Sequence, residues 1–305
     1  MTVVVIGAGV AGLACARVLH DAGVAVRVLE RAAAPGGRLG GDVVDGRPVD
    51  LGAAYFTASD PGFAAVVEGW HAAGLVHPWS GDFRVYGPAP AGRTQPVRWA
   101  APGGLAALAA ELAAGLDVTC GVAVKDLTVF DGPVVLAMPA PQAAEVLPAA
   151  AGLAAAQDWQ PSLAVALRYG RQDWKPLTGA FVNDHPVLTT LCDDGSRRGD
   201  GAPVLVAHTT PAFAIESAAG DVEAAVRELL DLPRAAVAVA VRRWPHARPS
   251  RPSDSAFAQV EGVYLAGDGF GRPRVEAAWL SGRSVARAML DYQNPKTPRT
   301  ASRAR

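Results

Sequence analysis

The sequence opens with Thr2-Val-Val-Val-Ile6 and runs directly into Gly7-Ala-Gly9-Val-Ala-Gly12. A continuous β-branched run of this kind is typical of a parallel strand that is buried on both faces. The three spaced glycines then permit a tight turn, a close approach of backbone to a ligand, and close packing of a helix on the strand. This stretch predicts a strand, a glycine turn and the start of a helix.

The next residues extend this start into a β-α-β unit. We predict a helix up to about Asp21, a glycine cap at Gly23, and a second apolar strand from Val24 that ends at Glu30. Amide donors at the helix start would face the diphosphate of a dinucleotide, and Glu30 would accept hydrogen bonds from its ribose. The unit predicts bound NAD or FAD, although glycines in an alanine-rich chain can also mark only a turn.

The rest of the chain predicts a second, sheet-based part, so that the fold class is α/β (α+β). The elements predicted there are helices over 59–73, 103–114, 221–230 and 275–290, short antiparallel strands within 77–99, and strands within 118–138, 163–169, 204–208, 237–244 and 263–266. We expect a cofactor domain formed by 1–55, 100–144 and 255–292, a substrate domain formed by 56–99 and 145–254, and a flexible tail over 293–305.

Composition restricts the possible partners. The net charge of -1 and the isoelectric point near 6.6 argue against nucleic acid or an anionic membrane as a partner. Three distant cysteines and scattered histidines suggest no disulfide framework and no metal site. Without a signal-peptide pattern or an apolar run of about 20 residues, we expect a soluble cytoplasmic protein.

Two further motifs favour FAD over NAD. The segment from Glu30 through Pro35-Gly-Gly-Arg38 resembles the first flavin motif of FAD-dependent amine oxidases. Gly262-Val-Tyr-Leu-Ala-Gly-Asp268, followed by Val275-Glu-Ala-Ala-Trp-Leu-Ser-Gly282, resembles their second flavin motif. The resemblance implies that one FAD is bound by both ends of the chain.

Within that superfamily the chain resembles the renalases, especially the bacterial ones, through the segments 51–60, 97–99, 137–142 and 267–282. This resemblance implies a p-hydroxybenzoate hydroxylase-like fold with noncovalent FAD. It also implies oxidation of the 2- and 6-dihydro isomers of NAD(P)H to NAD(P)+, with O2 reduced to H2O2. The family's β-meander is shortened here to the residues between Val122 and Val134.

The resemblance also implies roles for individual residues. Arg38 should face the phosphates, Tyr55 and Phe56 the flavin, Asp268 the ribityl or diphosphate oxygens, and the start of the last helix the flavin pyrimidine ring. A surface ion pair for Arg38 or Asp268, and core packing for Tyr55 and Phe56, are the alternatives. The predicted cofactor-binding residues are Gly7, Gly9, Val10, Ala11, Gly12, Glu30, Arg31, Gly37, Arg38, Tyr55, Phe56, Val122, Gly267, Asp268, Val275, Glu276, Ala277 and Ala278.

The substrate residues are less constrained by the sequence. Trp244-Pro-His246 is predicted to end a strand and aligns with a segment that borders the cavity of animal renalases, although a lone histidine is more often structural. Arg274 is a candidate because a diphosphate needs a cationic partner. The predicted cavity residues are Tyr55, Thr57, Trp99, Phe181, Trp244, His246 and Arg274.

Two other functions remain open at this level. An amine oxidase or desaturase acting on a small metabolite would call for an aromatic cage and a lysine-held water, but Lys125 and Lys175 are not clearly placed for this. A flavin-binding module without turnover is the third interpretation. Oxidation of a dihydropyridine needs no strong protein base, which agrees with the absence of an evident catalytic dyad.

Overall fold

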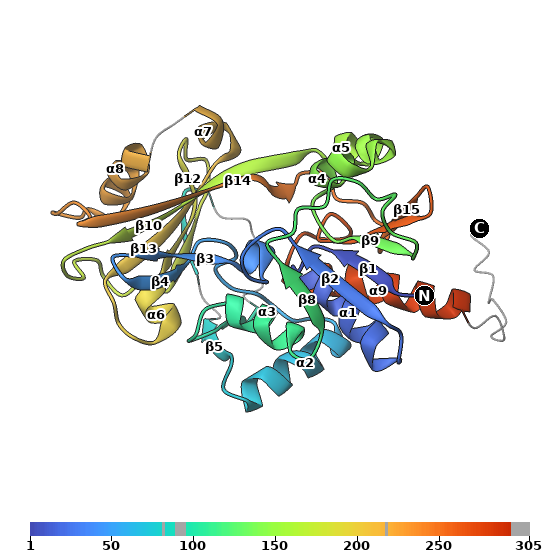
Figure 1. Cartoon of the computed structure of the whole chain (residues 1–305). Helices are drawn as coiled ribbons and strands as arrows, with labels where there is room; N and C mark the ends of the chain where they lie inside the picture. The colour runs from blue at the N-terminus through green and yellow to red at the C-terminus, as the bar shows by residue number, and fades with distance from the viewer. Residues whose placement is uncertain (81–82, 89–95, 217–218, 294–305) are drawn as a thin grey trace.

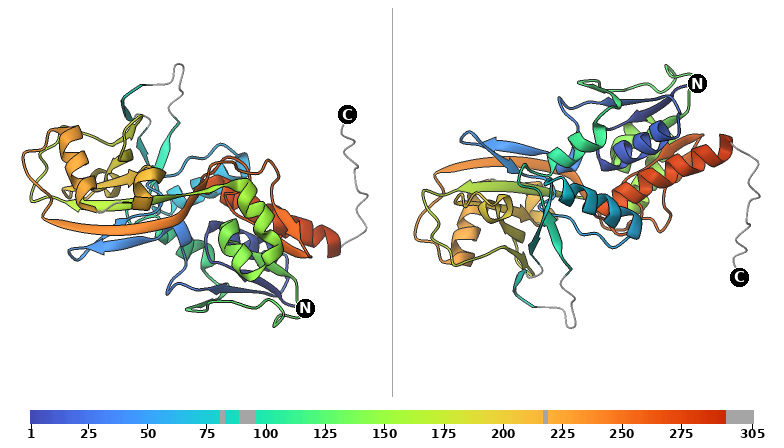
Figure 2. Two further views of the ribbon diagram at one scale, coloured as in Figure 1. Left: turned by 90° about the horizontal axis from the view of Figure 1, so that it is seen from above. Right: turned by 90° about the horizontal axis from the view of Figure 1, so that it is seen from below.

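The computed structural model describes residues 1–80, 83–88, 96–216 and 219–293, and within them it contains two six-stranded sheets (Figure 1). The two sheets lie beside one another in every view, each with its own helices (Figure 2). The predicted combination of a Rossmann-like α/β part with a second sheet is confirmed. The predicted tail lies, apart from Gln293, outside the described residues.

The first sheet is built around β1 (Val3–Ile6), whose four residues are all buried. β1 pairs in parallel with β2 (Val26–Glu30) and β9 (Val134–Leu136), in the order β15-β16-β9-β1-β2-β8. A central parallel strand is covered on both faces, which explains the unbroken apolar run. The other strands are β8 (Asp117–Cys120), β15 (Ala258–Val260) and β16 (Val263–Leu265).

Helices cover both faces of this sheet. α1 (Val10–Asp21) and α9 (Val275–Gln293) pack on one face, so closely that a Cβ on Gly282 would lie 1.9 Å from the Ala11 carbonyl oxygen. This crossing brings the last helix of the chain against the first. The same core includes α2 (Pro61–Ala72) and α3 (Ala106–Ala113), and the opposite face carries α4 (Ala140–Val146) and α5 (Ala151–Gln157).

The second sheet has the order β14-β10-β13-β12-β11-β6 and is antiparallel except between β11 and β6. One face packs under α7 (Pro211–Glu216) and α8 (Ala219–Leu230). Its strands are β6 (Arg84–Tyr86), β10 (Trp159–Arg168), β11 (Gly179–Val182), β12 (Leu188–Asp193), β13 (Val204–Thr209) and β14 (Ala238–Pro249).

The other face of the second sheet is turned toward the part of the molecule that contains the first sheet. There the hairpin of β3 (Gly41–Val44) and β4 (Arg47–Asp50) packs on Ala164 and Ala166 of β10. The hairpin therefore contacts the second sheet although its residues lie in the range expected for the cofactor domain. Helix α2 shows the converse, since it packs in the first core although it lies in 56–99.

Three local predictions differ from the structure. The strand expected to end at Trp244-Pro-His246 continues to Pro249 in β14. A proline is tolerated there because β14 is an edge strand and because its pairing with β10 is irregular between Gln160 and Ser162, opposite Pro245. Within 118–138 strands occur only in β8 and β9. The strands expected within 77–99 are β5 (His77–Ser80), β6 and β7 (Arg98–Ala100). β5 and β7 pair antiparallel as expected, whereas β6 is parallel to its partner β11. Residues 81–82 and 89–95 lie outside the described residues.

Candidate active site

The glycine turn between β1 and α1 leaves open space at one of its three glycines. A Cβ on Gly7 would lie 2.5 Å from the Ala137 carbonyl oxygen, and one on Gly12 would lie 1.9 Å from that of Gly7. A Cβ on Gly9 would meet no protein atom within 4 Å. Gly7 and Gly12 are thus required by packing, whereas Gly9 keeps clear the space before the first, unpaired amides of α1.

A second glycine-containing loop closes over this turn. The Gly36 amide donates to the Ala8 carbonyl at 2.9 Å, and a Cβ on Gly37 would lie 3.3 Å from the Gly9 Cα. The buried carboxylate of Glu30 accepts from the Ala8 amide at 2.7 Å and from the Ala32 amide at 2.8 Å. These contacts fix the glycine turn 7–12 and the loop 30–37 against each other, and the two together form one backbone cradle.

Arg38 and Asp268 join the N-terminal and C-terminal motifs. Arg38 Nη2 lies 2.5 Å from Asp268 Oδ1, and Nη1 lies 2.9 Å from Oδ2. The Arg38 Nη1 also donates to the Ala247 carbonyl of β14 at 2.9 Å, and the guanidinium lies 5.1 Å from the ring centre of Trp159. The pair is partly buried and stands where the two sheets meet.

The start of α9 is fixed by the buried carboxylate of Glu276. It accepts from the Ser59 amide at 2.5 Å, from the Asp60 amide at 2.6 Å and from Ser59 Oγ at 2.9 Å, and it pairs with Arg274. Burial opposes ionisation, but these donors and the guanidinium lower the pKa of Glu276 below its usual value. The Glu276 side chain is a structural clamp, and the ion pair accounts for Arg274, which also donates to Ser59 Oγ at 2.9 Å.

Side chains of the second part of the chain hold the segment 51–56 by its carbonyl groups. Trp244 Nε1 donates to Leu51 at 2.6 Å, and Arg197 Nη1 donates to Ala54 at 3.0 Å. His208 Nε2 donates to Gly52 at 2.9 Å, since a carbonyl can only accept, and burial lowers the pKa of this imidazole to about 4. The segment that carries Tyr55 and Phe56 is thereby fixed on the second sheet.

The two aromatic residues of that segment have different surroundings. Tyr55 lies 5.2 Å from Phe83, in a cluster that continues to Phe181 and packs on the buried Arg98. Phe56 is buried in the core of the first sheet and is bridged to Trp99 through both backbone groups, at 2.8 and 3.1 Å. Core packing explains the position of Phe56, whereas Tyr55 lies between the part with the first sheet and the part with the second sheet.

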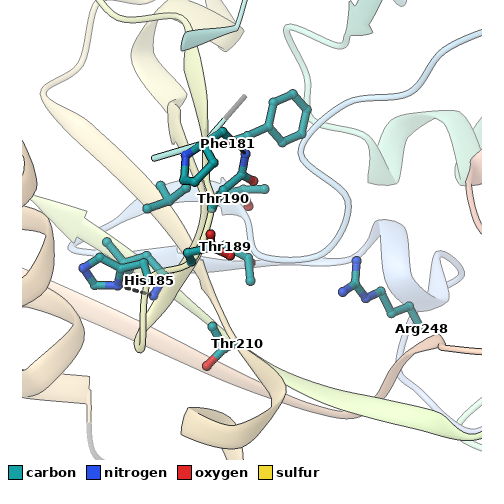
Figure 3. Close-up of a pocket in the computed structure, with 11 residues that line it drawn as sticks. Phe181, His185, Thr189, Thr190, Thr210 and Arg248 are labelled. Atoms are coloured by element: carbon teal, nitrogen blue, oxygen red, sulfur yellow. Dashed lines mark hydrogen bonds between the residues drawn. The ribbon is translucent and has the colours of Figure 1, made fainter. Parts of the chain in front are cut away.

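A cavity of about 790 Å³ opens on the second sheet (Figure 3). Figure 3 shows the Arg248 side chain across from the threonines of β12 and the loop after β13. Its lining residues are Pro88, Phe181, Val182, Asn183, Asp184, His185, Leu188, Thr189, Thr190, Thr210 and Arg248. Arg248 directly follows Ala247, whose carbonyl accepts from Arg38, so strand β14 connects this edge of the cavity to the Arg38–Asp268 pair.

Of the predicted cavity residues, Phe181 lines this cavity and the others do not. Trp244 instead packs under Arg242 and bonds to Leu51, and Thr57 is partly buried next to Phe56. His246 is partly buried in β14, and desolvation together with nearby arginines lowers the pKa of its imidazole against the attraction of Glu145.

Three further predicted cofactor residues lie just beyond the ends of strands of the first sheet. Arg31 is exposed beyond the end of β2. The Val122 amide donates to the Glu30 carbonyl at 2.9 Å, which holds residue 122 beside the acid. The Gly267 amide donates to Ser281 Oγ of α9 at 3.1 Å, so the turn before Asp268 is tied to the last helix.

Sequence reasoning missed Arg197, His208 and Arg248. Arg197 is fully buried, pairs with Asp194 and lies 3.3 Å from Asp50. The charged residues within 194–200 were the available signal in the sequence, but the sequence does not show which residue pairs with each of them. Within the described residues no group of three or more histidine, cysteine and acidic residues is arranged to hold a metal ion, and no helix is both long and apolar enough to span a membrane.

Comparison with known proteins assigns the fold and the family. A model of NAD(P)-binding Rossmann-like domains matches residues 5–69, and a model of flavin containing amine oxidoreductases matches residues 91–290. A hydroxyneurosporene desaturase from Rubrivivax gelatinosus is 49% identical over 55 residues, which are 18% of this chain. That match spans only 10% of the desaturase.

Solved structures of the same fold cover almost the whole chain. A protein from Exiguobacterium sp. 255-15 with the provisional name protoporphyrinogen oxidase has a TM-score of 0.75 at 14% identity, covering 94% of this chain and 98% of that one. A triple mutant of putrescine oxidase has a TM-score of 0.73 at 15% identity, with 96% and 100% covered. Cyclohexylamine oxidase from Brevibacterium oxydans IH-35A has a TM-score of 0.68 at 16% identity, with 96% and 99% covered.

At these identities the structural matches show the fold, and the family rests on the match over 91–290, well over half of the chain. The predictions of FAD as cofactor and of a flavoprotein in the amine oxidase superfamily are confirmed. The chain therefore belongs to the flavin-containing amine oxidoreductases and is an FAD-dependent oxidoreductase.

Proposed function

We propose that this enzyme oxidises the 2- and 6-dihydro isomers of NAD(P)H to NAD(P)+ and reduces O2 to H2O2, as the renalases that its sequence resembles do. The cavity of about 790 Å³, which β14 connects to the Arg38–Asp268 pair, carries the proposal. Ligand cavities of ~300–1,000 Å³ accept drug-sized molecules, so this space suits a nucleotide better than a small amine. The reaction would take place in the cytoplasm, without a second macromolecule.

We also propose the placement of the cofactor. The open space at Gly9, with the free amides of α1 behind it, fits an anionic diphosphate, and Glu30 and Val122 stand at the end of the cradle that suits the adenosine. Asp268 and Arg38 continue the cradle toward α9, whose first amides are likewise free of intrahelical partners. These residues hold FAD noncovalently, the part of the chain with the first sheet binds it, and the second sheet receives the substrate.

The residues of the chain mainly position the donor. Bound FAD would supply a two-electron acceptor for the hydride, with O2 as the final oxidant. Loss of hydride turns the dihydropyridine into an aromatic pyridinium, so no protein base has to remove a proton. The aromatic cluster of Tyr55, Phe83 and Phe181 reaches the cavity through Phe181 and would keep water from the donor ring, and the fixed segment 51–56 keeps Tyr55 in place.

Anaerobic mixing tests this proposal. The yellow holoenzyme is mixed separately with the 2-, 4- and 6-dihydro isomers of NADH and NADPH, and with a panel of primary and secondary amines. Loss of visible flavin absorbance with the 2- or 6-dihydro isomers, followed by H2O2 release on admission of air, is the expected result. Bleaching by an amine and by none of the isomers would reject the proposal.

An amine oxidase or desaturase is the second candidate. The family match and the carboxylate of Asp184 at the cavity favour it, because a cationic amine would pair with that carboxylate. The lysines tell against it: Lys125 and Lys175 are exposed and neither lines the cavity. In the experiment above, this function predicts bleaching that is lost in Asp184→Asn.

A further inference from the structure

Arg248 is a cation at the cavity whose charge no described residue neutralises. Its side chain is exposed, and it makes no hydrogen bond or ion pair within the described part of the chain. Other arginines of β14 are engaged: Arg242 donates to the Gly41 carbonyl at 2.8 Å, and Arg243 bonds to the Ala214 carbonyl. Arg248 alone of these three lines the cavity.

The cavity wall opposite Arg248 carries threonine hydroxyl groups that already donate their protons in hydrogen bonds within the protein. Thr189 Oγ1 donates to the His208 carbonyl at 3.1 Å. Thr210 Oγ1 donates to the Pro186 carbonyl at 2.9 Å and accepts from the Phe213 amide at 3.3 Å, which leaves it one lone pair. Thr190 Oγ1 lies 3.3 Å from Nδ1 of His208, the ring nitrogen that accepts because Nε2 donates to Gly52. These oxygens can therefore accept hydrogen bonds from a ligand but have little left to donate.

The cavity thus combines a guanidinium at one side with hydrogen-bond acceptors at the other. A ligand that fits both must carry an anionic group for Arg248 and hydroxyl or amide donors for the threonines. A phosphate attached to a ribose has this combination, and a guanidinium binds phosphate through two parallel hydrogen bonds. A simple amine offers only the donors.

Resting on the proposed function, we propose that Arg248 binds a phosphate of the dihydronicotinamide substrate and that Thr189, Thr190 and Thr210 accept from its ribose hydroxyls. Arg248 is well positioned for this because its neighbour Ala247 is held by Arg38 at 2.9 Å. Asp184 also lines the cavity, and its carboxylate disfavours a phosphate next to it, which restricts the direction in which the substrate lies.

Substrates of decreasing phosphate content test the subsite in the holoenzyme. The dihydronicotinamide donor is supplied as dinucleotide, as mononucleotide and as phosphate-free riboside, to wild type, Arg248→Ala and Arg248→Lys. For the two phosphate-bearing donors we expect kcat/KM to fall about 10- to 100-fold in Arg248→Ala, mainly through KM, with partial recovery in the lysine variant. The riboside should be oxidised equally by all three enzymes.

Arg251→Ala is the matched control, because Arg251 is exposed nearby and does not line the cavity, and its side chain hydrogen-bonds only the Ala155 carbonyl, at 3.5 Å, among the described residues. It should leave all three donors unaffected. Unchanged kinetics in Arg248→Ala, or an equal loss with the riboside, would overturn the subsite while leaving the proposed function intact.

Equilibrium binding separates the subsite from the reaction. Titration of the holoenzyme with NAD+, the non-reacting product, should give a Kd that rises about tenfold or more in Arg248→Ala and stays unchanged in Arg251→Ala. If no dihydronicotinamide is oxidised, the proposed function fails, and this titration still decides the subsite: an Arg248-dependent Kd supports it, and absent or Arg248-independent binding overturns it.

Discussion

Arg38 and Asp268 stand 230 residues apart in the chain and form a two-point ion pair, with Nη2 and Oδ1 at 2.5 Å and Nη1 and Oδ2 at 2.9 Å. The pair links the loop after β2 to the turn after β16, and Arg38 also reaches the backbone of β14. One side chain thus contacts both terminal motifs and the second sheet. It connects the backbone cradle to the strand that carries Arg248 at the cavity.

Breaking this pair is expected to weaken FAD binding about 10- to 100-fold, since each partner left behind keeps an uncompensated charge beside the cofactor. Arg38→Gln and Asp268→Asn should each show the loss by flavin fluorescence titration. The double variant should lose less than the two single variants combined. Arg171→Gln removes an exposed pair with Asp173 at 2.7 Å and serves as control; an equal loss there would contradict the assignment.

The imidazole of His208 makes stability depend on pH. Its pKa lies at about 4 in the folded chain, below the ordinary 6.5, so the unfolded chain binds the proton first. The free energy of unfolding should therefore fall as pH falls from about 6.5 toward 4, by at most about 3 kcal/mol, and be insensitive to this group above 6.5. Urea unfolding of wild type and His208→Asn checks this; parallel pH profiles of the two would contradict it.

The three cysteines should differ sharply in reactivity. Burial raises the pKa of both the Cys15 and the Cys192 thiol to about 12, so little thiolate forms at mildly alkaline pH. Cys120 is partly exposed. Labelling of native protein with a chromogenic disulfide should modify one thiol rapidly, Cys120→Ser should abolish that phase, and urea should expose the others. Rapid labelling of native Cys120→Ser would contradict the packing around α1 and β12.

The first sheet could be predicted from sequence because its signals are local. The apolar run of β1, the glycine turn and the acid that ends β2 all lie within 30 residues, and each has a direct structural cause. The cap of α2 was equally local: Asp60 accepts from the amides of Gly62 and Phe63 at 2.9 and 3.0 Å. Short-range chemistry of this kind needs no knowledge of tertiary contacts.

The cavity could not be predicted, because its residues are brought together by long-range pairing. The irregular pairing opposite Gln160 and Ser162 changes which face the later residues of β14 occupy, so alternation read from the sequence could not place Arg248 at the cavity. Arg197 and His208 reach segment 51–56 from distant strands and helices. Their roles depend on where that segment docks, which no local pattern encodes.

The response of melting temperature to FAD, compared in wild type and Gly9→Val, tests the cofactor placement most directly. Gly9 has φ -77 and ψ 178, which valine adopts freely, and its Cβ would meet no protein atom within 4 Å. Flavin-free Gly9→Val should therefore melt as the flavin-free wild type does, whereas Gly12→Ala, whose Cβ would lie 1.9 Å from the Gly7 carbonyl oxygen, should melt lower with or without FAD.

Added FAD should raise the melting temperature of the wild type and leave that of Gly9→Val unchanged, because the valine side chain fills the space assigned to the diphosphate. A variant that is stabilised by FAD as strongly as the wild type, or a wild type that FAD does not stabilise, would contradict a cofactor held across the two ends of the chain.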